Sequence, residues 1–324
     1  MKPGLQMNRR QAIVLLGVAG VATLSGGVVE RRFAAALKLA KAQSDSGSQV
    51  VATRFGAMEY AEAGTGSPIL MLHGTGGGFD QALLFAAPLA GAGFRVIAPS
   101  RFGYLRSDMP PDPSSENQAD ALVDLLDALG IDRVPVLGGS AGALSAIQFA
   151  IRHPDRCAAL VPIVPATYVP GRALVRPSAL GAAIMEYALG SDFLFWAGMT
   201  VAEDQMIATL LATDPALVHA ASASEQTRVR AILRGILPVS ARKQGLLNDG
   251  ALAGTPEPMP LDQIKAPTFA ISVEDDRFGT AAAARHIADS IKGARLVIYP
   301  TGGHLWVGHN AELFASVADF LKTI

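Results

Sequence analysis

Residues 134–143 read Val134-Pro135-Val136-Leu137-Gly138-Gly139-Ser140-Ala141-Gly142-Ala143, a short apolar run followed by the pattern Gly-x-Ser-x-Gly. Helix-forming residues continue from there to His153. A strand that turns sharply into a helix needs residues without bulk beside the turn, because the central residue is held in a strained conformation. The pattern therefore predicts a strand, a bend at Ser140 with room supplied by Gly138 and Gly142, and then a helix.

Ser140 is the candidate nucleophile of this chain. A bend of this kind exposes the serine hydroxyl above a helix N-terminus, where backbone N–H groups stabilise developing negative charge. The alternative is a glycine-rich turn without chemistry, since such turns between strands and helices are common. The apolar strand before the motif and the helix after it favour the catalytic interpretation.

The composition is that of a globular protein with a large core. Of the 324 residues, 50% are hydrophobic and 17% are charged, which is enough for one domain with an insertion or for two domains. The net charge of −1 excludes the basic surface that nucleic acid requires. The single cysteine, Cys157, can form no internal disulfide and lacks the paired spacing of a zinc site, so we expect it to be structural. The sequence implies no metal and no organic cofactor.

A glycine-rich stretch is the second chemical feature. The apolar strand 68–72 is followed by His73-Gly74-Thr75-Gly76-Gly77-Gly78, and consecutive glycines let a backbone approach a ligand with free N–H groups. A dinucleotide site fits poorly, because three consecutive glycines do not match its Gly-x-Gly-x-x-Gly spacing. A plain turn is the other alternative. An oxyanion loop fits best: the N–H of Thr75 or Gly76 and that of Ala141 would converge on one oxygen.

Strands alternate with helices over the first half of the globular part. We expect a hairpin over 50–63, strands at 68–72 and 95–98, and helices at 80–92 and 116–129. Such alternation requires crossover connections, so the predicted fold class is α/β with a mostly parallel central sheet flanked by helices.

At this point the chain resembles the α/β-hydrolase family, over about residues 50–164 and from 261 to the C-terminus. The resemblance rests on His73-Gly74 after a strand, on the motif around Ser140, and on an acidic and a histidine motif described next. The loop Ser100-Arg101-Phe102-Gly103-Tyr104-Leu105-Arg106-Ser107 is also similar to the family's Asp-x-x-Gly-x-Gly-x-Ser, although serine replaces the aspartate and leucine replaces the second glycine. The departure affects a structural loop and no expected catalytic role.

The resemblance implies the chain order serine, acid, histidine, since a serine hydroxyl needs a base and the base needs orienting. His304 follows the strand 295–299 and a glycine turn, and it precedes the last helix as the family's histidine does. His309, near the start of that helix, is the alternative. His73 belongs to the glycine-rich loop, where the family's histidine is usually structural.

The acid is expected just after the buried strand 268–273. The family pattern is an aspartate about three residues past the strand end, often followed by arginine, and Asp276 matches it. Asp275 is the alternative, and a solvated acidic turn is the interpretation without chemistry. The expected catalytic residues are therefore Ser140, Asp276 and His304.

An inserted helical region is expected between the two core parts. Helical patterns with Pro and Gly breaks and no strand-like runs fill 165–260, which is too long for a loop in a compact domain. We interpret it as a cap over the carboxyl edge of the sheet, between core parts 44–164 and 261–324. Its large apolar residues are expected to be mostly packing, with some of them facing the active site: Met185, Tyr187, Phe193, Phe195, Trp196, Met199 and Met206.

Residues 1–43 are expected to lie outside the fold. The Arg9-Arg10 pair precedes an apolar, glycine-rich run from Ala12 to Val29, which at about 18 residues is long enough to cross a bilayer as a helix. This N-terminal apolar helix would be an export signal of the twin-arginine type or an uncleaved membrane anchor. Positive charge directly after the run, from Arg31 onward, favours the anchor. The expected location is a bacterial-type inner membrane or periplasm.

The predicted function is that of a serine hydrolase acting on small apolar esters or acyl substrates, without nucleic acid as a partner. Within enzymes, the alternatives are cleavage of a carbon–carbon bond in an aromatic ring-fission product, and perhydrolase, acyltransferase or aminopeptidase chemistry. From another class, a non-catalytic binding protein on the same fold is the alternative. The presence of Ser140, Asp276 and His304 together argues against it.

Overall fold

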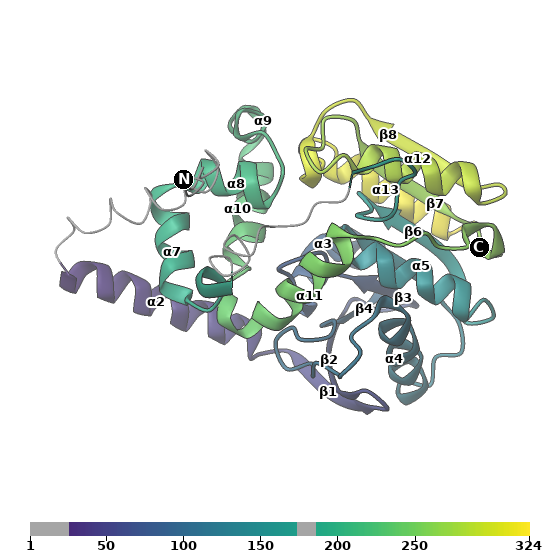
Figure 1. Ribbon diagram of the computed structural model, residues 1–324, viewed down its shortest axis with the longest axis horizontal. Helices are drawn as coiled ribbons and strands as arrows, with labels where there is room; N and C mark the ends of the chain where they lie inside the picture. The colour runs from purple at the N-terminus through teal and green to yellow at the C-terminus, as the bar shows by residue number, and fades with distance from the viewer. Residues whose placement is uncertain (1–25, 174–185) are drawn as a thin grey trace, which may run out of the picture.

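An eight-stranded sheet forms the centre of the computed structural model, which describes residues 26–173 and 186–324 (Figure 1). The strand order is β1-β2-β4-β3-β5-β6-β7-β8; β2 pairs antiparallel with β1 and β4, and all other pairs are parallel. The strands are β1 Ser48–Thr53, β2 Gly56–Ala63, β3 Ser67–Leu72, β4 Phe94–Pro99, β5 Val134–Gly139, β6 Cys157–Ile163, β7 Phe269–Val273 and β8 Arg295–Tyr299. The prediction of a mostly parallel sheet is confirmed.

Helices cover both faces of this sheet. They are α3 Phe79–Gly91, α4 Ser115–Ala128, α5 Gly142–Arg152, α12 Thr280–Ser290 and α13 Asn310–Leu321. Side chains of α3 and α13 share one apolar cluster with Ile69 and Met71, whereas α4, α5 and α12 share another with Leu70 and Leu72. Successive residues of a strand point to opposite faces, so a strand covered on both sides reads as a continuous apolar run.

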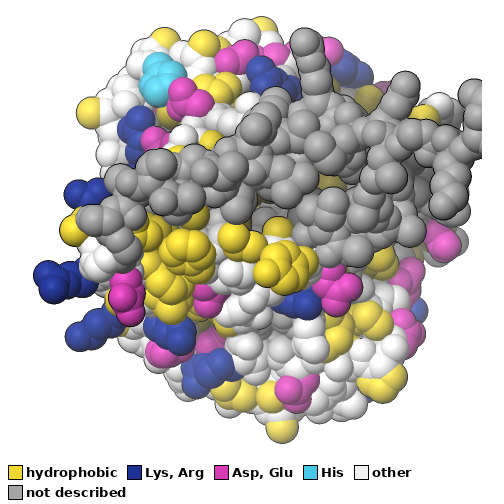
Figure 2. All heavy atoms as spheres, turned by 60° about the vertical axis from the view of Figure 1, so that its left-hand side comes forward, with side chains coloured by type: hydrophobic (Ala, Val, Ile, Leu, Met, Phe, Trp, Pro, Cys, Tyr) yellow, Lys and Arg dark blue, Asp and Glu magenta, His cyan; other side chains and the backbone are white. Residues whose placement is uncertain are grey.

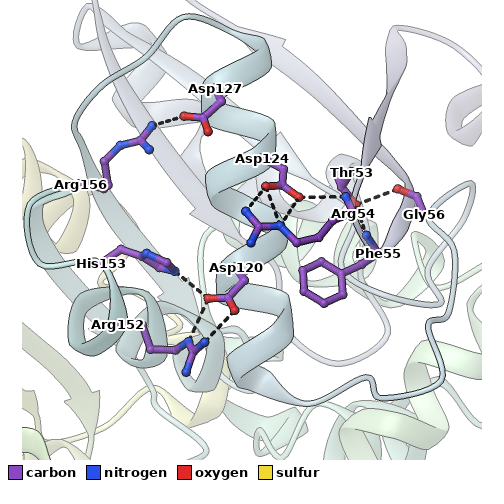
Figure 3. A network of polar contacts seen from close by, with 10 residues as sticks. All are labelled: Thr53, Arg54, Phe55, Gly56, Asp120, Asp124, Asp127, Arg152, His153 and Arg156. Atoms are coloured by element: carbon purple, nitrogen blue, oxygen red, sulfur yellow. Dashed lines mark hydrogen bonds and ion pairs between the residues drawn. The ribbon is translucent and has the colours of Figure 1, made fainter.

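Ion pairs join α4 to its neighbours on the outer surface (Figure 3). They are Arg54 with Asp124, Arg152 and His153 with Asp120, and Arg156 with Asp127. The arginines come from the β1–β2 turn, the end of α5 and the start of β6. Because these pairs are accessible to water, each contributes about 0–1 kcal/mol, and the core supplies most of the cohesion.

Between β6 and β7, the regular elements that the structure describes are helices joined by loops. Its helices are α7 Asp192–Val201, α8 Glu203–Leu210, α9 Pro215–Ala220, α10 Ala223–Arg234, η2 Val239–Arg242, α11 Lys243–Gly254 and η3 Leu261–Gln263. In Figure 1, α7, α8, α9 and α10 lie together on the left of the sheet and α11 runs toward the middle, whereas η3 packs against α5 and α12 of the core. The exact domain boundaries 44–164, 165–260 and 261–324 stay predictions.

The N-terminal part differs from the expectation. Most of the apolar run 12–29 lies outside the described residues, and the first described helix, α2 Gly26–Ser44, carries charged residues along much of its length. Within residues 26–173 and 186–324, no helix is both long and apolar enough to cross a membrane. The predicted N-terminal apolar helix therefore has no support in this part of the chain.

Helix α2 also packs against the fold, which corrects the prediction that everything before residue 44 lies outside it. The ring of Phe33 lies 5.3 Å from that of Phe193 and 5.6 Å from that of Trp196, both on α7. Ala40, near the end of α2, is buried in the core. Figure 2 shows hydrophobic side chains gathered beside lysine and arginine side chains on the face that α2 and α7 share. Contacts with residues 160 and 163 positions away were not visible in the local pattern.

Candidate active site

The bend at Ser140 has the predicted geometry. Ser140 directly follows β5 with φ of +52°, a left-handed conformation that is strained for a residue with a side chain. A Cβ on Gly138 would lie 2.8 Å from the Ala143 backbone, and one on Gly142 would lie 2.5 Å from the carbonyl oxygen of His73. Both glycines are therefore required by close backbone approach, as the sequence motif indicated.

The structure brings the three predicted catalytic residues into one chain of hydrogen bonds. His304 Nε2 lies 2.9 Å from Ser140 Oγ, and His304 Nδ1 lies 2.8 Å from Asp276 Oδ2. His304 sits on the short turn η4 Gly303–Leu305 after β8, and Asp276 sits on the loop after β7. Residues separated by 164 and 28 positions therefore meet because parallel strands end at the same edge of the sheet.

The Asp276 carboxylate is held in one orientation. It accepts hydrogen bonds from the Phe278 backbone N–H at 2.8 Å and from the Thr280 hydroxyl, and only 5% of the residue is exposed. Burial acts to raise the pKa of Asp276, but the charge and hydrogen bond of His304 outweigh it, so the pKa lies below the ordinary value. Asp276 is therefore suited to remain ionised beside a histidine that becomes charged.

The two alternatives have other positions. Asp275 accepts hydrogen bonds from the backbone N–H groups of Gly302, at 3.3 Å, and Gly303, at 2.7 Å. It therefore holds the turn that carries His304. His309 stacks on the ring of Tyr299 at 4.2 Å, away from the hydrogen-bonded chain.

His73 anchors the glycine-rich loop from within. Its Nε2 accepts from the Arg101 backbone N–H at 2.9 Å, and its Nδ1 lies 2.7 Å from the carbonyl oxygen of Gly74. Burial first, and then the charge of Arg101, lower the pKa of His73 well below its ordinary value, so the ring is neutral. This neutral, fully buried side chain stabilises the loop.

Thr75 and Gly76, the two candidate oxyanion donors of the glycine-rich loop, differ in their hydrogen bonds. The Gly76 N–H donates to the Tyr104 hydroxyl at 3.1 Å, whereas the Thr75 N–H has no acceptor among the described residues. The Ala141 N–H likewise has no acceptor in the described part of the chain. Thr75 and Ser140 both line the cavity beside the site. The geometry therefore favours Thr75 over Gly76 as the partner of Ala141.

A cavity of about 340 Å³ opens beside Ser140 and His304. Apolar side chains dominate its lining, among them Phe85, Leu211, Ile232, Phe278 and Trp306. Charged groups at its wall include Arg172, whose guanidinium donates to the carbonyl oxygen of Phe278, and Asp249. The cavity suits a small, largely apolar molecule.

Some of the seven large apolar residues of the helical region were expected to face this site, and the six that the structure describes do not line it. Met185 lies outside the described residues, and the six others from Tyr187 to Met206 are absent from the described cavity wall. Tyr187 is 75% exposed, while Phe195 and Met199 are buried among helices. Leu210, Leu211 and Ile232 line the cavity from the helical region instead. Helical periodicity does not reveal which face of a short helix turns toward the sheet.

One buried polar cluster was missed by sequence analysis. Arg101 forms two hydrogen bonds, of 2.7 and 2.6 Å, to the carboxylate of Asp249, which also accepts from the Tyr104 hydroxyl at 2.6 Å. The loop motif around residues 100–107 contained the arginine and the tyrosine. Its partner on α11, 148 positions later, had no recognisable pattern around it.

Cys157 is no candidate nucleophile, and the described residues form no candidate metal site. Cys157 is fully buried, and burial raises the pKa of its thiol to about 12. Among residues 26–173 and 186–324, no three His, Cys, Asp or Glu side chains gather in a way that could hold a metal ion.

Comparisons with known proteins point in one direction. The family model described as alpha/beta hydrolase fold matches residues 67–307. The 2-hydroxy-6-oxononadienedioate/2-hydroxy-6-oxononatrienedioate hydrolase of Paraburkholderia xenovorans (strain LB400) is 31% identical over 82% of this chain and 90% of its own length. The 2-hydroxy-6-oxo-6-phenylhexa-2,4-dienoate hydrolase of Burkholderia cepacia is 28% identical over 80% of this chain and 89% of its own.

Solved structures agree with that likeness. An alpha/beta hydrolase fold protein from Nakamurella multipartita is 28% identical with a TM-score of 0.63, over 85% of this chain and 98% of its own. The enol-lactonase of Burkholderia xenovorans LB400 has 24% identity and a TM-score of 0.61, over 85% of this chain and all (100%) of its own. At 24% identity, the likeness to the enol-lactonase shows a shared fold and nothing more.

Proposed function

This chain belongs to the α/β-hydrolase fold family and is a hydrolase, and from that premise we propose that it cleaves small apolar esters with a catalytic triad of Ser140, His304 and Asp276. The observation that carries the proposal is the continuous hydrogen-bonded chain from Ser140 Oγ through the His304 ring to Asp276, beside a cavity lined largely by apolar side chains. A nucleophile, a base and a group that orients the base are the parts that acyl transfer needs.

The distances assign a role to each side chain. Ser140 Oγ forms a bond to the acyl carbon while its proton passes to His304 Nε2. The His304 Nδ1–H donates to Asp276, whose carboxylate stabilises the imidazolium. The proton now on Nε2 then goes to the leaving alcohol as the ester C–O bond breaks. Water, deprotonated by the same nitrogen, attacks the acyl carbon, and the bond to Ser140 Oγ breaks to release the acid.

Negative charge on the carbonyl oxygen is stabilised by the N–H groups of Thr75 and Ala141 in this proposal. Neither has a hydrogen-bond acceptor among the described residues, so both are available to a substrate. Removing one such donor typically lowers kcat about 10²–10³-fold, because these bonds strengthen as charge develops. Gly76 is excluded from this role, because its N–H already has an acceptor.

The test is hydrolysis of p-nitrophenyl esters of rising acyl length by the full chain and by Ser140→Ala. We expect kcat of Ser140→Ala to fall by roughly 10⁴-fold or more, because triad residues act as a unit. A fluorophosphonate should label the parent protein and leave the variant unlabelled. Undiminished turnover by Ser140→Ala would overturn the proposed triad. The acyl length that gives the highest kcat/KM shows how long an acyl chain the cavity accommodates.

Carbon–carbon bond hydrolysis is a second candidate, because it is the reaction named for the Paraburkholderia and Burkholderia relatives. Arg172 lies at the cavity wall, where its guanidinium suits a substrate carboxylate. The measurement is the loss of absorbance of 2-hydroxy-6-oxo-6-phenylhexa-2,4-dienoate, a coloured compound, on incubation with the protein. If kcat/KM is higher for the dienoate than for every ester, carbon–carbon bond hydrolysis replaces the ester proposal. If the absorbance of the dienoate does not fall, this second candidate is overturned.

We also propose that the chain is exported or membrane-anchored through the residues that precede α2. The apolar run 12–29 supports the proposal, as does the exposed face of α2, where Val28 and Leu39 lie among Arg31, Arg32 and Lys38. An anchored chain is expected in the membrane fraction with the mass of the full sequence. A protein of full mass found entirely in the cytosolic fraction would overturn the proposal.

A further inference from the structure

Two ion pairs with buried arginines fasten the helical region to the core beside the glycine-rich loop. Arg101, on the loop after β4, pairs with Asp249 of α11 at 2.6 Å, and their side chains are 5% and 1% exposed. Arg242, at the end of η2, pairs with Asp80 of α3 at 2.6 Å. Both pairs therefore connect the helical region to core elements that flank residues 73–78.

These pairs reach the loop itself. Arg101 Nε donates to the carbonyl oxygen of His73 at 3.0 Å, and Arg242 Nη1 donates to that of Gly77 at 2.5 Å. Between these points, the Tyr104 hydroxyl accepts the Gly76 N–H at 3.1 Å and donates to Asp249 Oδ2 at 2.6 Å. The loop is thus held at its start, its middle and its end by side chains from outside it.

The Tyr104 hydroxyl is well suited to transmit this contact. The residue is fully buried. Burial first, and then the charge of Asp249, raise the pKa of Tyr104 well above its ordinary value, so the hydroxyl keeps its proton. A neutral hydroxyl can donate to the carboxylate and accept from the loop at the same time. Each of its two hydrogen bonds therefore depends on the position of the other partner.

We propose that Tyr104 and Asp249 are positioning residues of the oxyanion loop: by holding the Gly76 N–H, they aim the neighbouring Thr75 N–H at the oxygen of a substrate bound to Ser140. The proposal rests on the proposed serine-hydrolase function. It assigns α11 a second role besides lining the cavity, because the carboxylate that fixes the loop comes from that helix. The helical region thereby completes the catalytic geometry of the sheet.

The physical reason is the freedom of the loop backbone. Four of the residues from 74 to 78 are glycines, and Gly76 has φ of +81°. Such a segment loses more conformational entropy on ordering than any other. Oxyanion stabilisation requires donors that are already in place when charge develops. The Tyr104 hydroxyl, which accepts the Gly76 N–H, supplies that order from a residue that does not itself line the cavity.

The first test is steady-state kinetics of Tyr104→Phe and Asp249→Asn, which keep the shapes of the side chains. We expect kcat for the ester substrate to fall at least 10-fold in each, with KM little changed, because the loop acts on the transition state. Titration with a fluorophosphonate counts intact sites, so that kcat is expressed per active molecule. The matched controls are Tyr60→Phe, a buried tyrosine elsewhere in the core, and Asp204→Asn, an exposed acid of α8. Both should keep the parent kcat.

The second test does not depend on the reaction. Hydrogen-exchange mass spectrometry of a peptide containing residues 73–78 should show faster exchange in Tyr104→Phe than in the parent or in Tyr60→Phe, because the Gly76 N–H loses its acceptor. Unchanged exchange, or an unchanged kcat per titrated site, would overturn the positioning role. Turnover that survives in Ser140→Ala would instead overturn the serine-hydrolase proposal, while the exchange result would still test the clamp on the loop.

Discussion

The two halves of the helical region are attached to the rest of the molecule in different ways. Helix α7, with α2 beside it, contacts the rest of the molecule mainly through apolar and aromatic side chains, and its Phe193 is 37% exposed. One polar contact joins α7 to the other half: Asp192 accepts hydrogen bonds from the Ser240 backbone N–H at 2.9 Å and from the Ser240 hydroxyl at 2.8 Å. The half formed by η2 and α11 is held by buried ion pairs and by backbone bonds: the Leu105 N–H donates to Ala241, and the Gly245 N–H donates to Gly103.

The difference shows that one inserted segment can combine apolar contacts, which fix a position loosely, with polar contacts that fix one geometry. Apolar contacts have no preferred direction, so they define the position of α7 on α2 less sharply than hydrogen bonds and ion pairs would. A buried carboxylate that loses its guanidinium is strongly destabilised, so α11 has one favourable position. The rigid half lies against the glycine-rich loop, where geometry governs catalysis in our proposal. Three substitutions test this contrast.

The largest effect is expected for Asp249→Ala. It leaves the buried Arg101 guanidinium and the Tyr104 hydroxyl without their partner, which should lower the free energy of unfolding by about 3–5 kcal/mol. Asp204→Ala removes an exposed partner of His219 in the same region, and it should change stability by less than about 1 kcal/mol. Urea unfolding followed by circular dichroism gives both values. Equal losses in the two variants would abolish the contrast between the halves.

A smaller effect is expected for Gly245→Ala, within α11. Its Cβ would lie 2.2 Å from the ring of Tyr104, and overpacking of this kind lowers stability by about 1–3 kcal/mol. Gly250→Ala, in the same helix, meets nothing within 4 Å. It should therefore raise stability by about 0.5–1 kcal/mol, because alanine favours helices over glycine. Thermal unfolding of the pair provides the comparison, and a stabilised Gly245→Ala would contradict the close packing.

The smallest effect is expected for Phe33→Ala on α2. The substitution removes the edge contacts with Phe193 and Trp196, each worth about 0.5–1.5 kcal/mol beyond the area they bury. We expect faster hydrogen exchange in α7, with little change in the exchange of α11 and in kcat for the ester. A matching increase in α11 would mean that the two halves move as one unit.

Sequence analysis predicted the parts of the site that depend on local pattern. The bend at Ser140 was predictable because its glycines, strand and helix are contiguous, and the backbone at residues 138–142 has the expected form. His304 and Asp276 came from the family resemblance, and the structure places both within hydrogen-bonding distance of the expected partners. Sequence analysis left open whether Thr75 or Gly76 donates to the oxyanion, because the Tyr104 hydroxyl that accepts the Gly76 N–H comes from another loop.

Predictions were weaker where side chains meet across long separations. Some large apolar residues of the helical region were expected at the cavity, but Phe193 and Trp196 of α7 contact α2 instead, because the orientation of a short helix depends on the element it packs against. The same limit applies to α2, whose charged sequence hides the buried face around Phe33 and Ala40. Neither contact leaves a local pattern.

The α/β architecture and the bend at Ser140 could be predicted from short segments, since backbone strain, glycine spacing and strand periodicity act between neighbours in the chain. The proposed partners of Ser140, His304 and Asp276, came from the family resemblance. Only the folded arrangement shows which N–H of the loop lacks an acceptor among the described residues, which of these residues line the cavity, and that Asp249 reaches Tyr104 across 145 positions. Such contacts depend on how the helical region seats on the sheet, and that placement is a sum of many distant interactions that no single segment specifies.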